Sequence, residues 1–380
     1  MNTSDFIEKY NRDESESREL LPNFLVKSFA PTTFSELGFQ TEINSQNCLW
    51  KYIDTQHEGR YHDNLSLLNG KLTASEFELF QVATDVCIRF TKSIYKEIIP
   101  INALTRSLIS YRAIKSYCAS LNQIPSVLEV GPGSGYLGLL CGISGWQYSS
   151  LDVTKSLITY QNALWNFAGF KTKFAEAGIT YSDSEFMQIP WWIWADTKNS
   201  LPKRKILVAN HVIQEMTPFS LAFTVKRSKN IGAEFILAEG LGYGKYKNNM
   251  AIINKNSVLI HNNSLKTNYQ KVWIWKIDYK EKILLDNTDF LESTPKTKKE
   301  FVIGILLENK ILANLYSRIN KFRTRIRFKS KMGELLDKDM ANPSLTIDGS
   351  FLSDFIRSKK VSFYTEDELL MHWANYKGHT

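Results

Sequence analysis

One short stretch of the chain combines glycines and acids at a spacing that can bind a nucleotide-like ligand. It runs from Ser126 to Asp152 and reads SVLEVGPGSGYLGLLCGISGWQYSSLD. A strand-prone segment is followed by three alternate glycines, an apolar helix-like segment and a second short strand that ends on an acid. Glycines allow a tight turn and a close approach of the ligand to the backbone, and the helix behind them presents free N–H groups. Asp152 stands where a carboxylate can accept both hydroxyls of a ribose.

Two cofactor classes compete for this glycine loop. Counted from Gly133, GSGYLG fits the dinucleotide pattern G-x-G-x-x-G, but Gly131 is the glycine that directly follows the strand, and its sixth position is Tyr136. The better fit is E-x-G-x-G-x-G, which begins at Glu129. A carboxylate inside an apolar strand is costly unless it is paired, and a sulfonium-bearing cofactor offers a cation where a pyrophosphate offers only negative charge. This pattern resembles the first motif of class I S-adenosylmethionine-dependent methyltransferases.

The resemblance implies S-adenosyl-L-methionine as the cofactor and a set of contacts around the loop. The expected cofactor-binding residues here are Glu129, Gly131, Pro132, Gly133, Ser134, Gly135 and Asp152.

A second group of polar residues follows the strand-like segment Ile206–Ala209. Asn210 and His211 come directly after it, and ligands of open α/β sheets bind outside the carboxyl ends of the strands. We expect Asn210 to contact the cofactor. His211 is the candidate general base for a hydroxyl acceptor, since histidine is the residue type most often used in that role. Glu215, one helical turn on, could orient it through the other ring nitrogen. The alternative is that Asn210 and His211 only hydrogen-bond the cofactor or cap the next helix.

A dense apolar segment, FMQIPWWIW from Phe186 to Trp194, predicts a third strand. Asp196 lies just beyond it and is expected beside the adenine of the cofactor. Pro190 argues against a central, fully paired strand. The tryptophans of this segment either stack on a ligand or belong to the core, and the core is the favoured reading.

The succession of apolar strands and helices indicates an α/β fold. Phe235–Glu239 predicts a further strand, and Lys271–Asp278 and Phe301–Leu307 predict strands at an antiparallel edge. We expect a Rossmann-like, doubly wound and mostly parallel sheet covered on both faces. Residues 1–100 should form a mainly helical cap, residues 101–309 the core, and residues 310–380 a basic α+β extension.

Later motifs narrow the resemblance. The region between residues 124 and 244 resembles the putative sugar O-methyltransferases of bacterial surface-polysaccharide gene clusters. The motifs that carry this resemblance are LEVGPGSGYLG, IPWW, NHVIQEM and AEGLG. That likeness implies methyl transfer to a sugar hydroxyl of a polysaccharide or of its nucleotide- or lipid-linked precursor. The first and last thirds of the chain carry no matching motif.

Composition bounds the remaining functions. The 380 residues carry a net charge of +8, and eight basic residues without an acid lie between Lys310 and Lys331. This stretch either binds a phosphate of a linked sugar or forms a solvated basic face. No RNA-binding module is visible, so no nucleic-acid partner is expected.

Four scattered cysteines without a histidine or carboxylate cluster predict no metal site. The polar start and the lack of a long apolar run predict a cytoplasmic protein without an integral membrane segment. Two other functions stay open: an NAD-dependent sugar-modifying oxidoreductase and a non-catalytic scaffold of methyltransferase-like fold.

Overall fold

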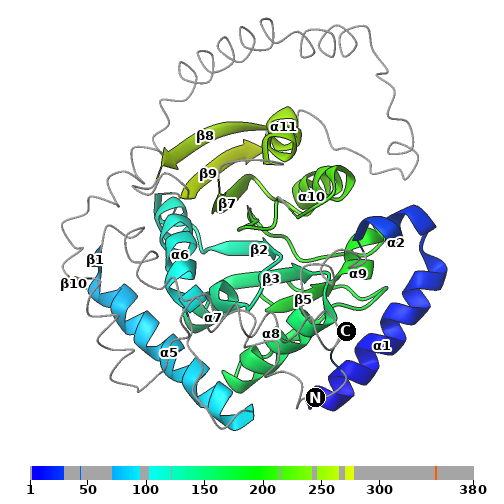
Figure 1. Cartoon of the computed structure of the whole chain (residues 1–380), viewed down its shortest axis with the longest axis horizontal. Coiled ribbons are helices and arrows are strands. Elements are labelled where there is room, and N and C mark those ends of the chain that lie inside the picture. Colours follow the sequence, from blue (N-terminus) through cyan, green and yellow to red (C-terminus); the bar gives the residue numbers. More distant parts are fainter. Residues whose placement is uncertain are drawn as a thin grey trace, which may run out of the picture.

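A computed structural model of the chain describes residues 2–29, 43, 71–94, 102–120, 122–213, 215–241, 246–264, 270–277 and 347–348. The predicted strand 301–307 and the basic stretch 310–331 lie outside these residues, as does most of the predicted C-terminal extension. The described part is built around one sheet with helices on both sides (Figure 1).

The sheet has eight strands in the order β4-β5-β3-β2-β6-β7-β9-β8. Their bounds, in chain order, are β2 (Ser126–Val130), β3 (Gln147–Asp152), β4 (Lys173–Phe174), β5 (Met187–Pro190), β6 (Ile206–Val208), β7 (Phe235–Leu241), β8 (Ser257–Ser264) and β9 (Gln270–Ile277). A separate two-stranded sheet pairs β1 (Lys71–Leu72) with β10 (Ile347–Asp348).

The order of the strands identifies the fold. With the short edge strand β4 set aside, the strands numbered along the chain lie in the order 3-2-1-4-5-7-6. The first five are parallel and follow the Rossmann order. The last strand, β9, inserts antiparallel between β7 and β8. This is the Rossmann-like class I methyltransferase fold, and the predicted mostly parallel sheet is confirmed.

The third strand of this order is β5, in the segment where the sequence predicts a strand and Pro190 argues against full pairing. β5 pairs with β3 along all four of its residues but with β4 only at Met187 and Gln188, so the strand forms and Pro190 is paired on one side alone. Pro190 is the last residue of β5, where the missing N–H no longer interrupts the ladder. The tryptophans that follow form the helix α9 (Trp191–Ala195) and are at most 3% exposed, so they belong to the core.

Helices cover the two faces of the sheet with separate apolar clusters. One face packs against α5 (Ala74–Ile94), α6 (Asn102–Ser120), α7 (Tyr136–Ile143) and α8 (Lys155–Phe167). The other packs against α9, α10 (Pro218–Asn230) and α11 (Tyr246–Asn256), with α2 (Asn23–Phe29) beside them. Strand side chains alternate between the clusters: Val127 of β2 belongs to the first and Leu128 to the second.

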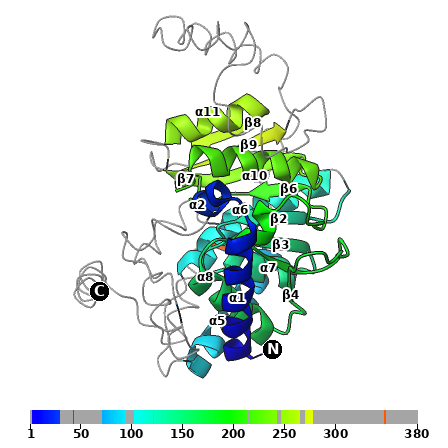
Figure 2. The same ribbon diagram turned by 90° about the vertical axis from the view of Figure 1, so that its right-hand side faces the viewer.

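The N-terminal helix α1 (Thr3–Leu20) is packed across one end of the sheet (Figure 2). Three of its side chains reach residues that follow three neighbouring strands. Asn11 accepts a hydrogen bond from Lys155 after β3 (3.0 Å), Glu14 from the Trp191 indole after β5 (2.9 Å), and Lys9 pairs with Glu176 after β4 (3.1 Å). Since these are the carboxyl ends of parallel strands, α1 covers part of the edge where ligands bind in such folds.

A buried ion pair joins α5 to α6. Thr73 and Glu76 form a capping box at the start of α5, with hydrogen bonds of 2.9 and 3.2 Å between each backbone N–H and the other side chain. The Glu76 carboxylate also receives two 2.7 Å hydrogen bonds from the Arg112 guanidinium. Burial raises the pKa of Glu76, but the hydrogen bonds and charge of Arg112 outweigh it, and the pKa is lowered.

We predict that Arg112→Met lowers the free energy of unfolding by about 3 to 5 kcal/mol, because the Glu76 carboxylate stays buried without its cation. The double variant Glu76→Gln with Arg112→Met should regain much of the loss, and Arg12→Ala at the exposed pair with Asp13 should change stability by less than about 1 kcal/mol. Urea denaturation measures all three. Equal effects of Arg112→Met and Arg12→Ala would contradict the assignment.

Candidate active site at the carboxyl edge of the sheet

The glycine loop between β2 and α7 is held in a backbone conformation that glycine favours. Gly131, Gly133 and Gly135 have φ angles of 62°, 57° and 73°. A Cβ atom on Gly131 would lie 2.6 Å from a methyl group of Val212, and one on Gly135 would lie 2.8 Å from the Trp165 ring. The loop is therefore packed between the segment after β6 and helix α8, and His211 stands next to one of its contacts.

Asp152 ends β3 as the sequence predicts and is almost completely buried. Its Oδ1 atom accepts hydrogen bonds from the backbone of Val153 and from the backbone and hydroxyl of Thr154 (2.7–3.1 Å). Its Oδ2 atom accepts one from Gln161 Nε2 (3.0 Å), which also donates to the carbonyl of Gly133 (2.8 Å). Burial raises the pKa of Asp152 to about 6, although these hydrogen bonds act in the opposite direction.

Gln161 of α8 thus joins the glycine loop to the acid of the next strand, a role that the sequence argument missed. The side chain is fully buried, and its Oε1 atom has no hydrogen-bond partner among the described residues. An unsatisfied buried acceptor is costly. A ligand hydroxyl that reached Asp152 would find a second acceptor here.

Glu129 has a partner within the protein. The Tyr148 phenol on β3 donates a 2.5 Å hydrogen bond to its Oε2 atom. A ligand cation is therefore not needed to satisfy this carboxylate, and the sequence-based reason for expecting one does not hold. Burial raises the pKa of Glu129 to about 7, the hydrogen bond from Tyr148 lowers it, and the charge of Asp152 adds to the rise.

His211 lies at the end of β6 and is paired with Glu239 of β7. Its Nε2 atom is 3.0 Å from Glu239 Oε2, and its backbone N–H donates to the Glu239 carbonyl (2.8 Å). The imidazole is 25% exposed, while the carboxylate is 1% exposed. His211 has a φ of 57°, which is uncommon for a residue with a side chain and occurs where surrounding contacts impose it.

Glu239, and not Glu215, is therefore the residue that orients the imidazole. The Glu215 side chain is exposed, and no hydrogen bond joins it to His211 among the described residues. Desolvation by the surrounding protein raises the pKa of Glu215, the charge of His211 lowers it, and the charge of Asp152 raises it. The charges of His211 and Asp152 therefore both act on the Glu215 carboxylate.

The side chain of Asn210 is engaged within the protein. Its Nδ2 atom donates to the hydroxyl of Ser110 on α6 (2.8 Å), and its Oδ1 atom accepts the backbone N–H of Glu239 (2.9 Å). Asn210 lies at the carboxyl edge of the sheet as predicted. Its side-chain hydrogen bonds, however, connect it to Ser110 and to Glu239, the partner of His211.

Asp196 does not join this group. It follows α9, accepts a hydrogen bond from the backbone of Lys198 (3.0 Å), and interacts electrostatically with Arg227 in the last turn of α10. The guanidinium of Arg227 also donates to the Trp194 carbonyl. Because β5 ends at Pro190 and α9 intervenes, Asp196 does not directly follow the strand, as the sequence argument assumed.

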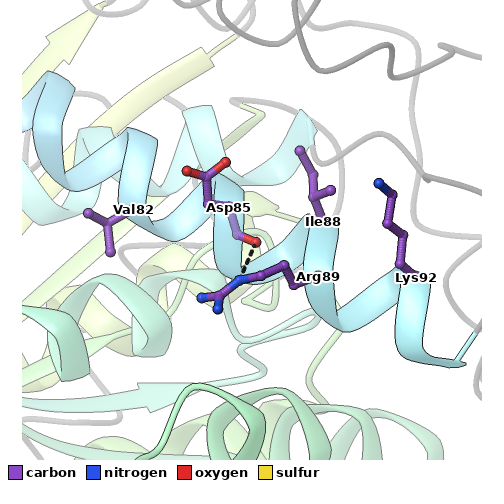
Figure 3. Close-up of a pocket in the computed structure, with 5 residues that line it drawn as sticks. All are labelled: Val82, Asp85, Ile88, Arg89 and Lys92. Carbon is purple, nitrogen blue, oxygen red and sulfur yellow. Dashed lines mark hydrogen bonds between the residues drawn. The ribbon is translucent and has the colours of Figure 1, made fainter.

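A hollow of about 490 Å³ lies elsewhere, on α5 (Figure 3). Its lining residues are Val82, Asp85, Ile88, Arg89 and Lys92, all from this one helix. Arg89 Nε donates to the Asp85 carbonyl (3.3 Å). Since no second described element brings polar groups to it, we assign no chemistry to this hollow.

The described residues lack two further features. They hold no group of three histidine, cysteine or acidic residues that could bind a metal ion. They also contain no helix whose length and apolar character would let it cross a bilayer.

Comparison with known proteins gives structural likeness only. No family model and no curated protein matches the chain. The solved structure of the pyocyanin biosynthetic protein PhzM is 9% identical with a TM-score of 0.33, over 47% of this chain and 58% of that one. The structure of WbdD is 13% identical with a TM-score of 0.32, and the match covers 45% of this chain and 39% of that one. The structure of magnesium protoporphyrin IX methyltransferase (ChlM) from Synechocystis PCC 6803 with bound SAM is 9% identical with a TM-score of 0.31. The match covers 53% of this chain and 97% of that one. Such low values transfer no activity, and the fold assignment rests on the strand order.

We predict that Glu129→Gln reduces the loss of stability between pH 5 and pH 8. A carboxyl whose pKa is raised by folding, from 4.5 to about 7, stabilises the fold most below pH 4.5, and this contribution is lost as the pH rises toward 7. The amide keeps an acceptor for Tyr148 and has no charge to bury. The variant should gain roughly 3 kcal/mol relative to the wild type over this range.

Urea denaturation at pH 5, 6, 7 and 8 measures this effect, with the exposed Glu19→Gln as the control that should follow the wild type. Asp152 contributes in the same direction in all three proteins. Parallel pH profiles for the wild type and Glu129→Gln would show that Glu129 is not the buried titrating group.

Proposed function

We propose that this protein is an S-adenosyl-L-methionine-dependent methyltransferase that methylates a hydroxyl group. The observation that carries the proposal is the meeting of three features at one edge of a class I sheet. These are the glycine loop, Asp152 at the end of the neighbouring strand, and the His211–Glu239 pair at the ends of the next two strands on the other side.

The residues present suit the cofactor. The free N–H groups in the first turn of α7 face the glycine loop, and Gly135 caps this helix without a side-chain hydrogen bond. Asp152 Oδ2 accepts only the hydrogen bond from Gln161 among the described residues, and Gln161 Oε1 accepts none. These two acceptors match the paired hydroxyls of a ribose. When bound, the cofactor supplies an activated methyl group for in-line displacement.

The chain's own contribution to the chemistry is alignment and removal of a proton. A hydroxyl is a poor nucleophile until it loses its proton, and a well-placed base adds about 10²- to 10⁴-fold to the rate. Glu239 occupies Nε2 of His211, so Nδ1, which no described residue hydrogen-bonds, is the atom that takes the proton. The buried carboxylate stabilises the imidazolium that results.

A sugar is the acceptor that we propose, as part of a surface polysaccharide or of its nucleotide- or lipid-linked precursor. The support is the set of motifs after the glycine loop, NHVIQEM above all. We assign Glu215 to acceptor binding, because its exposed carboxylate lies near His211 and can accept hydrogen bonds from sugar hydroxyls. We assign Glu129, through its hydrogen bond with Tyr148, to holding the strand that leads into the glycine loop. The proposed mechanism uses no metal ion.

The strand order bears on the alternatives. Dinucleotide-binding Rossmann sheets have the parallel order 3-2-1-4-5-6, whereas here an antiparallel strand separates β7 from β8. This favours methyl transfer over an NAD-dependent oxidoreductase. The strained His211 paired with a buried acid favours an enzyme over a scaffold.

We predict that S-adenosylhomocysteine binds the protein and raises its melting temperature, whereas NAD does not. Asp152→Ala should weaken binding at least about tenfold, because the ribose loses its main acceptor. Asp196→Ala is the matched control and should bind as the wild type does, since the Asp196 carboxylate accepts a hydrogen bond from the Lys198 backbone and α9 separates it from the end of β5. Isothermal titration calorimetry measures the affinities. Wild-type affinity in Asp152→Ala, or stabilisation by NAD alone, would exclude this cofactor site.

We predict that His211→Asn lowers kcat by about 10²- to 10⁴-fold while S-adenosylhomocysteine binding is kept, because the base is lost and the cofactor contacts remain. Glu239→Gln should lower kcat, and Glu215→Gln should mainly raise KM for the acceptor. The assay follows labelled methyl transfer from S-adenosylmethionine to a panel of free, nucleotide-linked and polymeric sugars. A normal kcat in His211→Asn would remove the histidine from the mechanism.

A further inference from the structure

Three consecutive residues of α6 connect this helix to three different parts of the protein. Ser110 meets the Asn210 amide after β6 (2.8 Å), and Arg112 forms the buried pair with Glu76 of α5. Between them, the Tyr111 hydroxyl lies 3.0 Å from that of Ser144, and its ring stacks on Trp146 at 4.3 Å. Ser110 therefore projects from a helix that is fixed on two other sides.

The orientation of the Asn210 amide follows from its partners. The backbone N–H of Glu239 can only donate, so the atom that faces it must be the amide oxygen. The NH₂ group must then face Ser110, whose hydroxyl can accept.

Asn210 holds Glu239, which is the residue that pairs with His211. The Glu239 backbone N–H donates to Asn210, its carbonyl accepts the N–H of His211, and its carboxylate meets the imidazole. A shift of Glu239 along β7 would move both of its contacts to His211. Because a displacement of about 1 Å is enough to spoil a catalytic contact, such support matters.

We propose that Ser110 and Asn210 are positioning residues that hold Glu239 so that His211 keeps its proton on Nε2 and leaves Nδ1 free to act as a base. This inference rests on the proposed function for its catalytic meaning, but the tautomer is a property of the free protein. It also gives Asn210 a role other than the cofactor contact expected from sequence, since both ends of its amide are engaged within the protein.

Nitrogen-15 NMR of histidine-labelled protein without ligand tests the proposal, because protonated and unprotonated ring nitrogens have distinct shifts. His211→Asn assigns the signal. In the wild type at pH above the imidazole titration, Nε2 should be protonated and Nδ1 unprotonated. Asn210→Ala should mix the two tautomers, and Ser110→Ala should do so to a smaller extent. Tyr111→Phe, which removes the neighbouring hydroxyl of the same helix, should give the wild-type spectrum.

The proposal is overturned if Asn210→Ala keeps the wild-type tautomer, or if Tyr111→Phe changes it as much as Asn210→Ala does. Should Asn210→Ala fail to fold, as judged by circular dichroism, Ser110→Ala decides: an unchanged tautomer rejects the proposal. The affinity for S-adenosylhomocysteine separates this inference from the proposed function. Unaltered affinity in Asn210→Ala together with a mixed tautomer supports positioning, whereas lost affinity with a wild-type tautomer would make Asn210 a cofactor ligand. Absence of S-adenosylhomocysteine binding in the wild type would reject the cofactor and leave the tautomer result intact.

Discussion

The site depends on one constraint: a buried carboxylate must have hydrogen-bond donors around it. The protein buries three acids at the carboxyl edge of its sheet, Glu129, Asp152 and Glu239, each at most 4% exposed. Their positions in the strands direct all three to the face covered by α6, α7 and α8. Desolvation of such groups costs several kcal/mol unless hydrogen-bond donors replace water. The donors that surround the three carboxylates are therefore needed for these acids to be buried at this edge.

Each acid meets this constraint differently, and the differences suit different tasks. Glu129 receives a neutral phenol, and its pKa is raised to about 7. Asp152 receives backbone, hydroxyl and amide donors and keeps acceptor capacity toward a ligand. Glu239 receives an imidazole that is open to solvent on its other side. In the proposed function, these three environments serve as an internal support, an acceptor for the ligand and an acid–base pair.

Strand ends were the most reliable sequence signal. Asp152 is the last residue of β3, and His211 lies shortly beyond the end of β6. The carboxyl ends of parallel strands meet at one edge of the sheet, so the sequence predicts both residues there. Glu239 is the last residue of the predicted strand Phe235–Glu239, although β7 itself continues to Leu241, so the same signal could have identified it as a site residue. Gln161 lies within a helix and carries no such mark. For Asp196 the same reasoning placed the strand end too late in the sequence, because β5 already ends at Pro190 and the helix α9 lies between them.

The sequence by itself determined the sheet, the glycine loop and the acid at its side, because periodic apolar residues and glycines act over a few neighbouring positions. It could not determine the partners of these groups. Tyr148 lies 19 residues from Glu129, Glu239 lies 28 from His211, and Ser110 lies 100 from Asn210. Only the packing of α6, α8 and the neighbouring strands brings them within hydrogen-bond distance. The tertiary structure therefore determines which donor pairs with each buried acid. A hydrogen bond requires contact within about 3 Å, and sequence spacing does not specify such a contact.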